Sequence, residues 1–286
     1  MTHDLDVSFP RSVSRAEFNR FVLERGRFQP NDPDFVYINP LTGVYFKLIP
    51  TWKRRLLRSD GVAAMRLEVN LFRPDFWGAE AAREIDLLIR QFGGRTSGPG
   101  GWSPDAFLRD WKQGNAQEIR ARLAEDPTPV PTLPAAELQR IWDWNYSADR
   151  RRRTPGQTLH VPTIFLARLD EDAENRVRVM SFWAEGAGSV LPRVDFVLAL
   201  KRLPGKAGAK GQKTAMIPWA EMVALAQKAG FAERDGQLVL DYAAMPAVIA
   251  DHLAGLSWSE DGGFATLSPH EVLDAENLPA PHDALT

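Results

Sequence analysis

The segment Asp126–Pro134 constrains the fold of this chain more than any other feature of its sequence. Four of its nine residues are proline. Each proline removes a backbone N–H donor and favours extended geometry, so the segment can be neither a helix nor a central strand. We interpret it as a linker at 126–134. It separates an N-terminal α+β subdomain at 1–125 from a C-terminal α+β subdomain at 135–258, and an acidic tail follows at 259–286.

Composition excludes several classes of protein. With 286 residues, of which 44% are hydrophobic, the chain has enough apolar material for a packed core and is neither disordered nor a coiled coil. The absence of cysteine excludes disulfides, a thiolate nucleophile and cysteine-ligated metal. The first ten residues lack the apolar core of a secretory signal, and no uncharged apolar run is long enough to cross a bilayer. We therefore expect a cytoplasmic protein with no membrane partner.

Charge is distributed unevenly along the chain. The tail from Ser259 to Thr286 contains six acids and no Lys or Arg, which leaves the body with 35 basic and 31 acidic residues. A formal charge of +4 on that body is too small to indicate a nucleic-acid partner.

Hydrophobic periodicity predicts secondary structure in both halves. In the N-terminal half, a capping box at Ser14–Glu17 predicts a helix from Arg15 to Arg25, and the turn Asn39–Gly43 predicts a hairpin with Gly43 at positive φ. Pro74 opens a helix that Gly93 ends, and Gly114 divides two short helices. The predicted strands of this half are Asp4–Phe9, Phe35–Ile38, Val44–Ile49 and Val62–Phe72.

The C-terminal half shows a similar mixture. A helix is predicted over Ala135–Asp149, and the Gly- and Lys-rich stretch Lys201–Lys213 is predicted to be an exposed loop. The predicted strands are Val161–Leu169, Arg176–Trp183, Asp195–Lys201 and Leu238–Leu240. Helices are grouped rather than alternating with strands, which favours an α+β fold with mostly antiparallel sheets and the two halves as candidate subdomains.

Paired carboxylates are the first candidate for chemistry. Glu80 and Glu84 lie four residues apart on a predicted helix, and two such acids can act as acid and base when their pKa values differ. Paired glutamates on an exposed helix face, screened by Arg83 and Arg90, are the commoner arrangement. No histidine spacing indicates a metal site and no motif indicates a cofactor, so we predict no catalytic residue, metal or cofactor.

Arg150–Arg153 is the strongest basic cluster in the sequence. Four adjacent arginines can neutralise phosphates, and Trp144 lies close enough in sequence to stack on an unpaired base. Alternatively, the arginines form a solvated turn onto which the acidic tail folds. We regard nucleic acid as the weaker partner class.

The nine tryptophans indicate a different kind of surface. Most should be core residues, but Trp77, Trp102 and Trp111 adjoin Gly- and Pro-rich segments where aromatic side chains can be partly exposed. Tryptophan and arginine are enriched at the energetic centres of protein interfaces. The residues predicted to bind a partner are Trp77, Trp102, Trp111, Arg73, Arg150, Arg151, Arg152 and Arg153.

Several motifs along the chain resemble those of a known group. They are Tyr37–Phe46, Val69–Ala81, Trp111–Asn115, Ile141–Tyr146, Val161–Pro162 and Leu191–Asp195. Together they resemble the signatures of a family of uncharacterised bacterial cytoplasmic proteins, over about Leu5 to Leu273, and more loosely toxin-immunity-type proteins. The resemblance implies a toxin or effector protein as partner and brings no catalytic residues. The stretch Gly205–Lys213 departs from the pattern.

The leading functional hypothesis is therefore a non-enzymatic, protein-binding protein, either antitoxin- or immunity-like or an adaptor. The alternatives are a nucleic-acid-binding protein that uses Arg150–Arg153, or a hydrolase or transferase whose carboxylates meet only in the fold. For the enzyme the first candidates are Glu80, Glu84 and Asp195. A deep pocket with two carboxylates would favour the enzyme, and a flat aromatic surface would favour the binder.

Overall fold

The computed structural model describes residues 1–55, 58–96, 101–154, 158–184, 187–202 and 212–278. The chain divides into two compact units: unit 1 comprises Met1–Gln139 and His270–Thr286, and unit 2 comprises Arg140–Pro269. This division differs from the predicted one, because Asp126–Pro134 belongs to unit 1 and does not separate the units. The segment from His270 to Leu278 returns to unit 1 instead of forming part of a separate tail.

A mostly antiparallel sheet with strand order β2-β3-β4-β5-β1-β6 is the centre of unit 1. Its strands are β1 (Thr2–Ser14), β2 (Phe28–Asn31), β3 (Asp34–Ile38), β4 (Tyr45–Arg55), β5 (Arg58–Asn70) and β6 (Arg95–Thr96). The predicted hairpin is confirmed, since β3 pairs with β4 and Gly43 has φ 76°. Along β5 the apolar residues Met65, Leu67 and Val69 are buried, as the period-2 pattern predicts.

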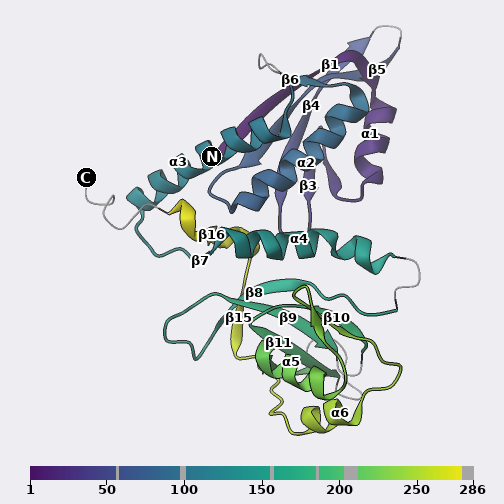
Figure 1. The fold of residues 1–286 in the computed structure, drawn as a ribbon. Helices are drawn as coiled ribbons and strands as arrows, with labels where there is room; N and C mark the ends of the chain where they lie inside the picture. Colours follow the sequence, from purple (N-terminus) through teal and green to yellow (C-terminus); the bar gives the residue numbers. More distant parts are fainter. Residues whose placement is uncertain (56–57, 97–100, 155–157, 185–186, 203–211, 279–286) are drawn as a thin grey trace. The chain divides into compact units, whose positions relative to one another are not determined.

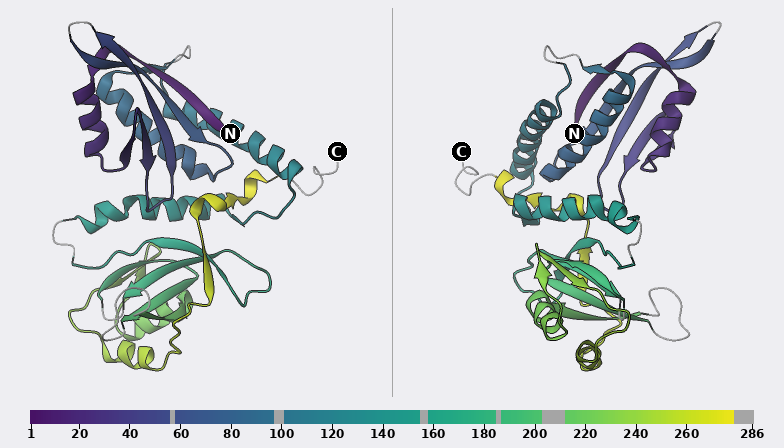
Figure 2. Two further views of the ribbon diagram at one scale, coloured as in Figure 1. Left: turned by 180° about the vertical axis from the view of Figure 1, so that it is seen from behind. Right: turned by 45° about the vertical axis from the view of Figure 1, so that its right-hand side comes forward.

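Helices α1 (Arg15–Glu24) and α2 (Asp75–Phe92) cover one face of this sheet, as Figures 1 and 2 show. The two helices meet where the Phe18 ring stacks on Phe92. The predicted signals hold at their ends: the Ser14 hydroxyl accepts the Glu17 N–H, and Gly93 ends α2 with φ 66°. An apolar stripe on α2 thus fixes that helix against the sheet.

Helix α3 (Pro104–Glu125) corrects one prediction, because it runs without a break through Gly114. A glycine inside a helix costs only about 1 kcal/mol relative to alanine, and packing on both sides exceeds that cost. Trp111, Asn115 and Ile119 are all buried, and the Trp111 ring lies against Gly78 of α2. A side chain at Gly78 would collide with that ring, so the glycine permits the close approach of the two helices.

The segment Val272–Asn277, which we call the strap, connects the Pro-rich segment with the starts of α2 and α4. Strand β16 (Leu273–Asp274) pairs in parallel with β7 (Thr132–Leu133). The Asp274 carboxylate accepts the Asp75 N–H at the start of α2, at 2.7 Å, and Glu276 accepts the Ala135 N–H. Burial and the nearby Asp75 carboxylate raise the pKa of Asp274 to about 6. The strap therefore caps one helix with a buried acid.

Unit 2 contains a five-stranded sheet with order β12-β11-β9-β8-β15 among the described residues. Its strands are β8 (Ile164–Leu169), β9 (Arg178–Ala184), β11 (Phe196–Arg202), β12 (Gln212–Pro218) and β15 (Phe264–Leu267). All neighbours pair antiparallel except β9 and β11, which are parallel. Phe165, Phe182 and Phe264 pack on one face over Ala167, Met180 and Leu198.

Smaller elements complete the two units. Helix α4 (Ala135–Arg152) begins in unit 1 and continues into unit 2 from Arg140. Unit 2 also contains a sheet of order β10-β14-β13 and two helices. Their bounds are β10 (Ser189–Pro192), β13 (Glu233–Arg234), β14 (Gln237–Leu240), α5 (Trp219–Lys228) and α6 (Ala247–Ala254). Most of the predicted loop Lys201–Lys213, at 203–211, lies outside the described residues.

Helices, strands and pairing together confirm the predicted fold class, an α+β protein with mostly antiparallel sheets. Among the described residues, none of the helices has the length and apolar character needed to cross a membrane.

Candidate binding groove

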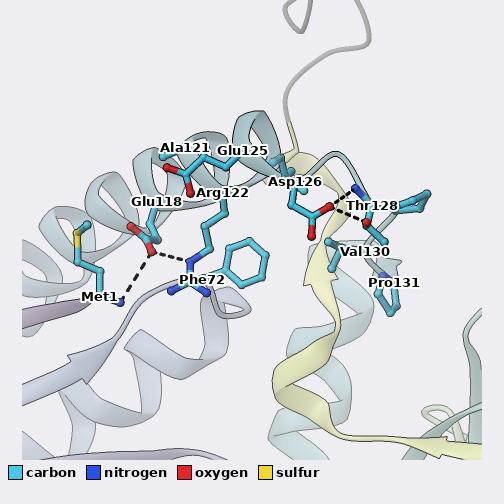
Figure 3. A pocket seen from close by; sticks show the side chains of 12 residues that line it. Met1, Phe72, Glu118, Ala121, Arg122, Glu125, Asp126, Thr128, Val130 and Pro131 are labelled. Carbon is cyan, nitrogen blue, oxygen red and sulfur yellow. Dashed lines mark hydrogen bonds and ion pairs between the residues drawn. The ribbon is translucent and has the colours of Figure 1, made fainter.

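A groove in unit 1 runs between the C-terminal turns of α3 and the Pro-rich segment, as Figure 3 shows. Its cavity volume is about 780 Å³. The lining residues come from the start of β1, the turn after β5, the end of α3 and the extended segment that follows. They are Met1, Phe72, Glu118, Ala121, Arg122, Leu123, Glu125, Asp126, Thr128, Pro129, Val130 and Pro131.

Phe72 contributes an aromatic ring to this groove from an unusual backbone position. Its φ is 60°, in the left-handed region that bulky residues rarely occupy. The buried Asn115 side chain of α3 holds the adjoining residue from both sides, because it accepts the Arg73 N–H at 3.1 Å and donates to the Arg73 carbonyl at 2.7 Å. These two hydrogen bonds fix the turn against α3 and keep Phe72 in place.

An ion-paired group forms the inner end of the groove. The Arg122 Nε donates to Glu118 Oε1 at 2.7 Å, and the Met1 amine lies 3.8 Å from the same oxygen. Glu118 is only 7% exposed, and the Arg122 guanidinium lies 4.9 Å from the centre of the Phe72 ring. Charge on Glu118 is therefore balanced within the chain.

The outer end is acidic. Asp126, the residue that ends α3, accepts the Thr128 N–H at 3.1 Å and the Thr128 hydroxyl at 2.6 Å. These hydrogen bonds lower the pKa of Asp126, so its carboxylate is charged at neutral pH. Glu125, one residue earlier, is also exposed. Figure 3 shows Asp126 beside Thr128 and the extended wall, whereas the Glu125 side chain points back along α3 toward Ala121.

Two of the predicted partner-binding tryptophans are core residues. Trp77 and Trp111 are each 0% exposed. The Trp111 ring packs against Gly78 of α2, and the Trp77 ring packs edge-to-face with Tyr45. A partner has no access to either ring in this structure, which corrects their proposed role. Trp102 is half-buried, and its Nε1 donates to Asp86 at 3.0 Å. Arg73 adjoins the groove residue Phe72, but its guanidinium donates to the Phe72 carbonyl and to the Tyr45 hydroxyl.

The arginines 150–153 lie partly on a helix, not on the short connector that the sequence predicts. Arg150, Arg151 and Arg152 belong to the last turn of α4, where positive charge favours the helix dipole. Arg151 lies 3.9 Å from the centre of the Trp144 ring and donates to the Trp144 carbonyl, while Arg152 donates to the Val161 carbonyl. Arg150 and Arg153 are exposed.

Glu80 and Glu84 are buried, contrary to the predicted exposed helix face. Glu80 is 0% exposed and accepts hydrogen bonds from the Tyr37 hydroxyl and the Asn39 amide, both at 2.6 Å. The Arg25 guanidinium pairs with Glu84, through an Nε that lies 3.0 Å from Oε2. Burial, together with the Glu80 charge, raises the pKa of Tyr37. This network ties α2 to the sheet and to the end of α1.

Asp195, the third candidate carboxylate, lies in unit 2. Its Oδ2 accepts the Val179 N–H at 2.8 Å, and its own N–H donates to the Val179 carbonyl at 2.8 Å. These bonds hold the start of β11 beside β9, which is a structural role. In the part of the chain that the structure describes, no cluster of three or more His, Asp or Glu side chains is arranged to hold a metal ion.

The groove was not among the sequence predictions, although parts of it leave a signal. The i, i+4 pair Glu118–Arg122 and the Asp-x-Thr turn at 126–128 can both be found from spacing alone. Nothing local shows that Phe72 meets Arg122, because fifty residues separate them and only folding brings them together.

Fold and groove define an α+β protein with an open surface groove in its N-terminal unit. Comparisons with protein-family models, curated protein sequences and solved structures find no match to this chain. The groove and its residues therefore carry the functional argument.

Proposed function

We propose that the protein acts by binding a partner protein, and that the groove of unit 1 holds an extended segment of that partner. The observation that carries this proposal is the exposure of the lining. Seven of its twelve residues are exposed: Met1, Ala121, Arg122, Glu125, Asp126, Thr128 and Pro129. Sites for small molecules usually enclose most of the ligand surface, whereas this groove is open along its length.

The walls also fit a chain better than a compact ligand. One wall is a helix and the other is an extended segment, and the apolar surface of Phe72, Leu123, Val130 and Pro131 is distributed between them. A partner segment can place successive side chains against these surfaces, which is how extended and helical peptides are usually recognised. The toxin or effector identity of the partner, and the antitoxin- or immunity-like role, stay predictions.

Peptide selection combined with a groove-filling variant tests this function. Peptides are selected from a displayed random library on the immobilised full chain, and their affinities are then measured in solution. Ala121→Trp places a large side chain in the groove, and Ala124→Trp adds the same side chain to the exposed surface of the same helix outside it.

We expect selected peptides to bind the wild type and Ala124→Trp equally, and to bind Ala121→Trp at least about tenfold more weakly, since a blocked groove loses its central contacts. Equal binding to both tryptophan variants, or no selected peptide at micromolar affinity, would refute the proposed function.

A further inference from the structure

The carboxylates of the groove are not all neutralised by positive groups of the chain. This difference indicates which chemical groups of a partner segment the groove would favour. Three carboxylates line the groove, from Glu118, Glu125 and Asp126, against one guanidinium and one amine. Both positive groups lie at Glu118, at the inner end. Asp126 remains as an exposed carboxylate at the outer end, and Glu125 is an exposed carboxylate that points back along α3.

The position of the two outer acids strengthens this imbalance. Glu125 is the last residue of α3 and Asp126 is its C-cap. The carboxyl end of a helix carries partial negative charge, so acids there are unfavourable and cations are favourable. Arg122, the basic residue of this last turn, donates to Glu118. A positive group supplied by a ligand at this end would therefore be stabilised by the Asp126 carboxylate and by the helix dipole together.

The extended wall limits how an occupant can be held. Pro127, Pro129 and Pro131 have no N–H, and the Thr128 N–H is donated to Asp126. This stretch therefore lacks the alternating donors that pair a strand with a sheet edge. Side chains, rather than a backbone ladder, must provide both affinity and specificity.

We infer that the groove recognises a partner segment that carries Lys or Arg beside apolar residues, with the positive charge at Asp126 and the apolar side chains on Phe72, Val130 and Pro131. This inference rests on the proposed function, because it names the partner chemistry of the same groove. Asp126 is suited to the role, since its two hydrogen bonds from Thr128 fix its carboxylate before a ligand arrives.

Three peptides of one length test the inference by fluorescence anisotropy. They share the apolar residues of a peptide selected on the groove and carry Lys, Gln or Glu at the remaining positions. Glu125→Gln with Asp126→Asn removes the two outer charges and retains an oxygen that can accept from Thr128. The control, Glu24→Gln with Asp110→Asn, removes two exposed acids of unit 1 that do not line the groove.

We expect the Lys peptide to bind the wild type and the control about tenfold more tightly than the Gln peptide, which corresponds to one exposed ion pair together with the helix dipole. The Glu125→Gln/Asp126→Asn variant should lose this preference and still bind the Gln peptide as the wild type does. Raising the salt concentration should reduce binding of the Lys peptide toward that of the Gln peptide.

If the Gln or Glu peptide binds as tightly as the Lys peptide, and Ala121→Trp still blocks all three, the groove binds a segment but the inferred charge is wrong. If Ala121→Trp blocks none of them, the proposed function itself fails.

Discussion

At the scale of single residues, Asn115 stabilises one side of the groove although it does not line it. Its amide satisfies both backbone groups of Arg73 from within a buried position, and the neighbouring Phe72 keeps a left-handed conformation that costs about 1–3 kcal/mol. Such a conformation persists only where surrounding contacts fix it. The groove therefore depends on one amide in the adjacent helix.

Replacing Asn115 with alanine should lower the free energy of unfolding by about 2–3 kcal/mol, because the part-buried N–H and carbonyl of Arg73 lose the buried amide that pairs with both. Urea denaturation measures the change. Gln113→Ala, at an exposed position of the same helix, should change it by less than about 0.5 kcal/mol. Equal effects of the two substitutions would show that the amide does not hold the turn.

Gly43 provides a second test at this scale. Its φ of 76° closes the turn between β3 and β4, and its N–H donates to the Asn39 carbonyl at 2.8 Å. Gly43→Val should destabilise the protein by about 1–3 kcal/mol, because a β-branched residue is strained there. Leu41→Ala, in the same turn, should cost less. An unchanged thermal midpoint for the valine variant would contradict this account.

At the scale of elements, the sequence predicts regular structure well where a local signal decides it. The Ser14 cap, the Gly93 helix end and the alternation along β5 all act over a few residues, and all three predictions are confirmed. The predicted helix break at Gly114 is wrong, because the low helix propensity of glycine is a small effect compared with the packing of Trp111 and Asn115 around it.

The Pro-rich segment shows what local signals cannot predict, which is a contact between residues distant in the sequence. Its prolines correctly exclude a helix over 126–131, but they do not show that β7 pairs with a strand 141 residues later in the chain. The pairing partner is Leu273–Asp274, in what reads as an acidic tail. Contacts between segments this distant depend on the whole fold, so the candidate groove could not be assembled from sequence patterns.

The strap leads to a prediction about pH. The pKa of Asp274 is raised to about 6 by burial and by the Asp75 and Glu276 carboxylates, while Lys112 pairs with Asp75 and the Asn277 amide contacts both acids. Because the folded state holds the proton more tightly, this group favours folding most below pH ~4. Its contribution is lost as the pH rises to about 6 and beyond.

Asp274→Asn should therefore remove a pH dependence of about 2–3 kcal/mol, and the variant should be more stable than the wild type at pH 7. An asparagine oxygen can still accept the Asp75 N–H. Urea denaturation between pH 4 and 7.5 gives the comparison, with the exposed Asp110→Asn as control. A constant difference between wild type and Asp274→Asn across this range would mean that Asp274 does not titrate there.

At the scale of the whole molecule, the distribution of charge helps to distinguish a protein partner from a nucleic-acid partner. The chain carries a formal charge of −2. Among the tail acids predicted to fold onto the arginine run, Asp274 and Glu276 accept backbone N–H groups of unit 1. In unit 2, Arg151 and Arg152 donate to carbonyls of their own unit. Within the run 150–153, Arg150 and Arg153 then remain as exposed side chains for a phosphate backbone.

We therefore expect no sub-micromolar binding of DNA or RNA by the full chain at low salt. Each phosphate contact changes the logarithm of the affinity by about 0.7–0.9 per logarithmic unit of salt, and two contacts give only a weak dependence. Gel-shift titrations with single- and double-stranded DNA and RNA measure it. Arg150→Ser with Arg153→Ser is the informative variant, since it leaves in place the contact of Arg151 with Trp144 and the hydrogen bond of Arg152 to Val161. Tight binding by the wild type that this variant loses would favour a nucleic-acid partner over the protein partner proposed for the groove.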